Sequence, residues 1–130
     1  MPTDYTLARF GDAEDRGAKH GLTAIETRTL RAELDSEHLG VSHFKVQPNF
    51  RPPFGHHHEV QEEAYVVIAG SGRFKLGDDF VDVARGDVLR VAPHVMRGFE
   101  AGPEGLELII VGSDRPVEGD GHLQADWWPV

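Results

Sequence analysis

The chain of 130 residues contains no cysteine. This absence excludes a disulfide framework and a thiol nucleophile, and it permits a reducing compartment. Long hydrophobic runs are absent too, because the longest, residues 64–69, is far too short to span a bilayer. The N-terminal residues carry scattered charges and no apolar stretch of signal-peptide length. We therefore expect a soluble, cytoplasmic protein with no membrane partner.

Basic residues are scarce, since 13 Lys and Arg against 22 Asp and Glu give a formal net charge of −9. With no basic cluster to offset it locally, this charge opposes binding to nucleic-acid phosphates or anionic lipids. The serines lack the context of a hydrolase nucleophile, and residues 70–72 lack the lysine of a phosphate-binding loop. Nucleic acid is therefore not an expected partner.

Helical periodicity is rare, whereas short runs of alternating or β-branched residues recur between turn signals. Residues 23–29 favour a strand, and residues 30–35 could instead form a helical turn. Further strands are predicted at 41–47, 64–68, 73–76, 80–83, 88–91, 96–100 and 106–111, with turns at 70–72, 77–79, 84–87 and 101–105. Many short strands with regular turns predict an all-β sandwich or barrel, and a double-sheet jelly roll fits their number.

The stretch from Gly55 to Gly70, GHHHEVQEEAYVVIAG, holds the residues best suited to bind a metal. His56 and His58 are two positions apart, so in an extended segment both point to the same side. Neutral imidazole is the commonest metal ligand, and a carboxylate such as Glu63 often accompanies it around a divalent ion. The pattern predicts a site with two nitrogen ligands and one oxygen ligand. The alternative is that the three histidines form only a polar loop.

The order Gly, His-x-His, four residues, Glu, six residues, Gly resembles the first motif of the cupins. The resemblance implies a double-stranded β-helix, or jelly-roll barrel, with its core at about residues 39–112. It implies a single cupin domain over 1–130, with an N-terminal arm at 1–38 and a C-terminal tail at 113–130. Small cupins commonly form homodimers, so a homodimer is expected. Trp127 and Trp128 are expected either to fold back onto the barrel or to form a dimer contact.

The second cupin motif ends in the histidine that completes the metal site of the family. The matching segment here, GDVLRVAPHVMRGF from Gly86 onward, has His94 at the usual glycine and Arg97 at the usual histidine. A guanidinium is permanently charged and offers no lone pair, so Arg97 is not a metal ligand. His94 is predicted to lie in a turn and to point elsewhere. The resemblance thus implies an incomplete centre of two histidines and one glutamate.

Two roles are open for Arg97. It can grip the carboxylate or phosphate of a small ligand, or it can pair with Glu63 and close a degenerate site. The expected metal ligands are His56, His58 and Glu63, holding zinc, iron, manganese or nickel, with a metal-free barrel as the equal alternative. We expect a cupin-domain protein, of unassigned specific activity, that binds a divalent metal, a small anionic ligand or both. The alternative is a metal-free binding or structural cupin, and the sequence assigns no catalytic residue.

Overall fold

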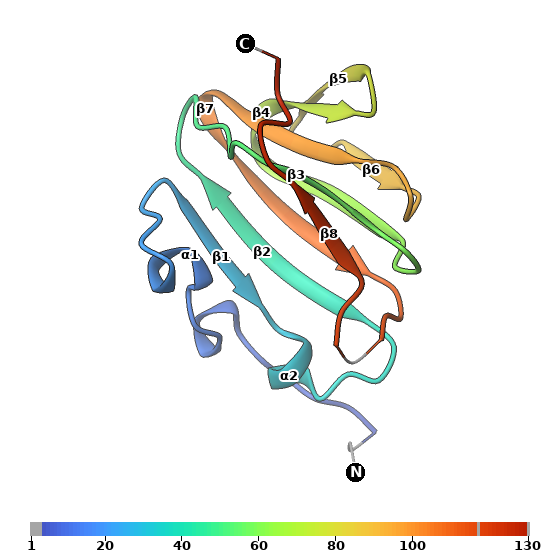
Figure 1. The fold of residues 1–130 in the computed structure, drawn as a ribbon. Coiled ribbons are helices and arrows are strands. Elements are labelled where there is room, and N and C mark those ends of the chain that lie inside the picture. Colours follow the sequence, from blue (N-terminus) through green and yellow to red (C-terminus); the bar gives the residue numbers. More distant parts are fainter. Residues whose placement is uncertain (1–3, 117, 130) are drawn as a thin grey trace.

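The computed structural model describes residues 4–116 and 118–129. In chain order the elements are η1 (Phe10–Asp12), α1 (Arg16–Lys19), β1 (Ile25–Thr29), α2 (Arg31–Leu34), β2 (Gly40–Val46), β3 (Gly55–His58), β4 (Glu63–Leu76), β5 (Asp79–Ala84), β6 (Val88–Val91), β7 (Arg97–Gly112) and β8 (Gly121–Gln124). The strands form a curled antiparallel sheet, and the short helices lie near β1 (Figure 1). No helix in the described part of the chain is long and apolar enough to cross a membrane.

The two longest strands, β4 and β7, organise the sheet. They pair with each other along most of their length, and β7 also pairs with β2 and β3. Five neighbouring strands follow the order β1-β2-β7-β3-β8, and β4, which pairs with β7, also pairs with β5 and β6. The sheet curls so that β3 and β8 lie over β2 and β7 in the ribbon view (Figure 1). The all-β jelly roll predicted from the sequence is confirmed.

Alternating side chains of β4 and β7 form the core. Tyr65, Val67 and Phe74 come from β4, and Leu106 and Leu108 from β7, and none is more than 2% exposed. Each such side chain stabilises the fold by roughly 1.5–3 kcal/mol through burial. Because side chains alternate along a strand, this inward set also fixes which residues at the ends of the strands face the interior.

Two predicted turns, at residues 70–72 and 101–105, are wrong, because β4 and β7 continue through them. The glycines bend the long strands instead: the β4–β7 register shifts between Val67 and Ala69 and again between Gly70 and Gly72. Gly70 has a φ of 75°, and a Cβ atom there would collide with the carbonyl oxygen of Gly105. These glycines are therefore needed for a bulge and a close backbone approach.

The remaining strand predictions agree with the structure more closely. The β4–β5 hairpin turns at Gly77, and the strand predicted at 88–91 is β6. Residues 23–35 contain both the strand and the helical turn that the sequence suggested. Strand β1 ends at Thr29, and α2 follows it. Strand β8, which pairs with β3, was not predicted.

The tryptophan tail folds back onto the barrel. The Trp127 ring lies 3.3 Å from Lys75 Nζ, and Trp128 lies 5.1 Å beneath the Arg51 guanidinium and is 8% exposed. A Cβ atom at Gly55 or Gly98 would meet the Trp127 ring. Glycine at these two positions therefore makes room for the indole against the barrel.

Candidate functional site

Strand β3 presents the histidine triplet on two faces. Pro52 and Pro53 stiffen the loop before the strand, and Gly55 is the first residue of the strand. His56 and His58 face the interior, whereas His57 stacks on His122 with ring centroids 5.0 Å apart. Strand alternation thus separates one histidine from the other two, as predicted.

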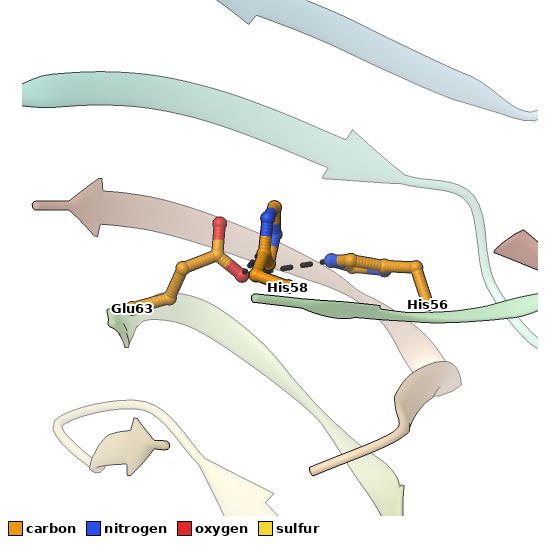
Figure 2. Close-up of side chains that lie close together, drawn as sticks. All are labelled: His56, His58 and Glu63. Carbon is orange, nitrogen blue, oxygen red and sulfur yellow. Dashed lines mark ion pairs between the residues drawn. The ribbon is translucent and has the colours of Figure 1, made fainter. Parts of the chain in front are cut away.

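The two inward imidazoles converge on Glu63, the first residue of β4. Glu63 Oε1 lies 3.5 Å from His56 Nε2 and 3.5 Å from His58 Nε2. One ligand atom from each of the three residues lies within 4.8 Å of the others, an arrangement suited to a metal ion. Figure 2 shows both rings directed toward the same carboxylate oxygen. The structure therefore brings together the three residues that the sequence singled out.

Asp120 holds the far side of the His58 ring. Its Oδ1 lies 2.9 Å from His58 Nδ1, and its Oδ2 accepts the backbone N–H groups of Val60 and Gln61, each at 2.8 Å. Because a carboxylate accepts, neutral His58 carries its proton on Nδ1 and points the Nε2 lone pair at the centre. Nε2 is buried and has no hydrogen-bond partner among the described residues.

Arg97, at the start of β7, lies beside the same carboxylate. It is paired in register with His56, and its Nη2 is 3.3 Å from Glu63 Oε1. Its Nη1 donates to the carbonyl oxygens of Pro93 and Val95, at 3.1 and 2.8 Å. The side chain is completely buried, and within the described structure Nε and Nη2 find no hydrogen-bond acceptor.

The charges of the centre are set by these contacts. Burial tends to raise the pKa of Glu63, but the contacts with His56, His58 and Tyr65 outweigh it and hold the pKa well below its usual range. The Tyr65 hydroxyl donates to Glu63 Oε1 at 2.8 Å, and burial keeps the pKa of Tyr65 well above its ordinary value. Glu63 is therefore an anion, and its charge is balanced by Arg97.

The contacts of the centre also shift the pKa values of His58 and Asp120. Burial tends to lower the pKa of His58, yet its contacts with Glu63 and Asp120 raise it overall. Burial opposes ionisation of Asp120, but the N–H groups of Val60 and Gln61 and the His58 ring lower its pKa to about 2. Without a metal, the anionic neighbours therefore favour a proton on His58.

The residues present fit a divalent metal. Two imidazoles and a carboxylate are a ligand set found in zinc and non-haem iron sites. His58 Nε2 is buried and has no hydrogen-bond partner among the described residues, so in the neutral ring its lone pair would be free for a metal. Arg97 opposes a second cation by Coulomb repulsion. The positive charge of Arg97 is cancelled by the negative charge of Glu63, however. The pair is therefore neutral before a metal binds.

Other residues separate into those that belong to the site and those that do not. His94 is exposed in the turn before β7 and is not part of the metal-suited group, which consists of His56, His58 and Glu63. Tyr65 and Asp120 complete the centre but were not predicted. The alternation of β4 after Glu63 could have indicated Tyr65, whereas Asp120 comes from the tail and no spacing rule connects it to His58.

A cavity of about 420 Å³ adjoins the centre. His56 and Arg97 lie in its wall, which is otherwise formed largely by apolar side chains. The aromatic residues Phe44, Phe50 and Phe99 are among them. Residues of β1 and α1, outside the predicted barrel core, complete the wall. The metal-suited group thus lies next to a space large enough for a small molecule.

Comparison with known proteins agrees with this architecture. A family model described as a cupin domain matches residues 42–112. The chain is similar to a cupin protein from Bacteroides fragilis, with 19% identity, 98% of each chain covered and a TM-score of 0.69. It is similar to KdgF from Halomonas sp., with 14% identity, 89% of this chain and 90% of that chain covered, and a TM-score of 0.62. Oxalate decarboxylase from Bacillus subtilis shares 23% identity over 92% of this chain and 32% of its own, with a TM-score of 0.69. At these identities the solved structures show the fold alone, and no curated protein matched the chain.

Proposed function

The chain belongs to the cupin family, and we propose that it binds a divalent metal through His56, His58 and Glu63, next to a small organic anion. The observation that supports this best is the approach of three ligand atoms to within 4.8 Å of one another. Zinc, iron, manganese and nickel all accept such ligands. When bound, the metal supplies a Lewis acid that polarises an oxygen of the ligand.

The surrounding residues have separate roles in this proposal. Asp120 orients His58 and fixes its tautomer, and Tyr65 donates to Glu63. Arg97 balances the charge of Glu63 through an ion pair of its Nη2, and neither Nη2 nor the buried Nε forms a hydrogen bond among the described residues. A carboxylate is the acceptor that best matches a guanidinium. We infer that the ligand carries an acid group and that this group approaches Arg97.

Elemental analysis tests the metal directly. Untagged protein purified without nickel resin should contain about one divalent metal per chain after incubation with zinc, iron or manganese. His58→Ala should remove most of this metal because it deletes a ligand. His57→Ala is the matched control, since the ring of His57 lies on the other face of the same strand and the metal should stay. Equal metal content in the two variants would contradict the proposed centre.

A metal-free anion-binding cupin is the second candidate. The 3.3 Å contact between Arg97 Nη2 and Glu63 Oε1 favours it, because an ion pair can fill the place of the metal. Wild-type protein that stays empty after incubation with all three metals would select this candidate over the first.

The proposal extends to the whole chain. Strands β1 and β8, outside the matched segment, pair with β2 and β3, which supports a single domain over 1–130. Strand β8 is an edge strand, and its Leu123 is 73% exposed, which is compatible with a homodimer. We further propose that the protein is cytoplasmic, in keeping with its lack of cysteine.

A further inference from the structure

The wall of the cavity beside the centre indicates what kind of molecule it receives. We propose that its ligand is an organic acid with one anionic group and a hydrophobic aryl or alkyl body, and that hydroxyl-rich or dibasic acids are poor ligands. This inference rests on the proposed function, because it places the acid group at the centre described above. It adds the chemical class of the rest of the ligand.

The charge of the wall selects an anion. Although the whole chain carries −9, none of the described residues lining the cavity is acidic. The charged or chargeable groups there are two arginines and two histidines: Arg16 and His20 from the α1 region, with His56 and Arg97 on the barrel strands. Arg16 and His20 are exposed, whereas Arg97 is completely buried. A buried anion must be paired, and the two arginines and two histidines of the wall are the cationic partners that the cavity offers it.

The rest of the wall selects a hydrophobic body. Phe44, Phe50, Phe54 and Phe99 line the cavity together with Ile25. The side-chain hydroxyl groups in the wall are those of Thr27 and Thr29, and the Thr29 hydroxyl already accepts a hydrogen bond from Ser42. A sugar acid would bury several hydroxyl groups that find no partner here, at roughly 1–3 kcal/mol each. A hydrocarbon body instead gains roughly 25 cal/mol for each Å² of apolar surface that it buries.

The volume agrees with a small molecule rather than a peptide. The cavity of about 420 Å³ lies in the range of roughly 300–1,000 Å³ typical of sites for small ligands. Its wall combines four barrel strands with the loop at 50–54 and the α1 region.

Matched ligands test body and charge separately. Phenylbutyrate, octanoate and naphthoate provide apolar acids, phenylbutylamine has a similar body with the opposite charge, and galacturonate and oxalate have polar or dibasic structures. Calorimetry and heteronuclear NMR on the full chain should show at least one apolar acid binding more than roughly tenfold tighter than the amine, galacturonate or oxalate. The resonances that shift should include those of Ile25 and Phe99. Tighter binding of galacturonate or the amine, or no binding of any apolar acid, would overturn the inference.

A pair of leucine variants locates the site. Leu22 lines the cavity and is 43% exposed, so Leu22→Asp should fold while placing a negative charge in the wall. It should weaken binding of the apolar acid by roughly tenfold or more, because like charges repel at close range. Leu39→Asp is the control, since Leu39 is 53% exposed and lies outside this wall. Equal effects of the two variants would contradict binding in this cavity.

Metal content measured in the same samples separates this inference from the proposed metal site. Metal-free protein that still binds an apolar acid with shifts at Ile25 and Phe99 would reject the metal and retain the ligand class. Metal-loaded protein that binds none of the apolar acids would retain the metal and overturn the ligand class. Shifts of the cavity resonances with protein concentration alone would show that a second copy fills the space, and would also overturn it.

Discussion

Asp120 determines which nitrogen of His58 faces the centre. Its carboxylate is held by two backbone N–H groups, so it meets the ring only as an acceptor. His58 therefore donates from Nδ1, and in the neutral ring Nε2 keeps its lone pair on the side of Glu63. A carboxylate behind a ligating histidine also raises the basicity of the ring. Asp120 is thus a positioning residue for the proposed metal ligand.

We predict that Asp120→Asn weakens zinc binding by roughly 10–100-fold. The asparagine oxygen can keep the bonds from Val60 and Gln61 and present its NH₂ group to His58 Nδ1. The ring then carries its proton on Nε2, which cannot ligate a metal. Competition with a chromophoric chelator measures the affinity. Asp114→Asn, at an exposed carboxylate near His38, is the control, and similar zinc affinities of the two variants would contradict the role of Asp120.

The raised pKa of His58 predicts opposite pH trends with and without metal. In the metal-free protein, the stabilisation from protonated His58 is complete below its ordinary pKa of about 6.5 and is lost as the pH rises through the higher folded value. The lowered pKa of Asp120, about 2, adds stability above pH about 4 that is lost as the pH falls. Zinc requires neutral His58, so zinc should stabilise more as the pH rises.

Thermal unfolding at pH values on both sides of neutrality tests these trends. The melting temperature of metal-free protein should fall between pH about 6 and 8, while the increase caused by zinc should grow over the same interval. His58→Ala should remove most of both trends. A zinc effect that is independent of pH would show that His58 does not release a proton to the metal.

At the residue scale, sequence spacing predicted the metal-suited group but not Asp120, the residue that orients His58. His56 and His58 follow from strand alternation, Glu63 follows as the carboxylate that often accompanies two imidazoles around a metal, and the cupin spacing agrees with all three. Arg97 lies beside the centre, 3.3 Å from Glu63 Oε1 and in register with His56. Its role in ligand binding stays a prediction. Asp120 was missed because its contact with His58 spans 62 residues, and local sequence rules carry no information at that distance.

At the scale of elements, the glycines of the long strands let two backbones approach each other. Gly70 closes the histidine motif, and its place is explained by the carbonyl of Gly105 rather than by a turn. The bulges between residues 67 and 72 bend β4, so that one strand serves both the metal-suited group at its start and the hairpin at its end. Strand signals located most elements, but sequence alone could not distinguish a bulge from a turn, because glycine favours both.

We predict that Gly70→Ala destabilises the fold more than Gly77→Ala. Both glycines have a positive φ, so either alanine costs roughly 1–2 kcal/mol in backbone strain. At Gly77 a Cβ atom has no neighbour within 4 Å, whereas at Gly70 it collides with a backbone oxygen. The cost at Gly70 should therefore exceed about 3 kcal/mol. Denaturant unfolding measures the difference, and equal costs would contradict the close approach of β4 and β7.

At the scale of the whole molecule, segments outside the matched family region complete the site. The tail contributes Asp120 and β8 on one side, and the α1 region contributes Arg16 and His20 to the cavity wall on the other. Trp127 holds the tail near β3 through its contacts with Gly55 and Lys75. The jelly roll therefore provides the common framework, while the arm and the tail shape the chemistry of this chain.

The location of a bound metal tests the proposed function most directly. Crystals of zinc-loaded protein, measured on both sides of the zinc absorption edge, would show the ion by its anomalous scattering. We predict one strong peak within bonding distance of His56 Nε2, His58 Nε2 and a Glu63 carboxylate oxygen. A peak only at surface histidines such as His57 and His122, or Arg97 still paired with Glu63 and no peak beside them, would contradict a metal centre in this barrel.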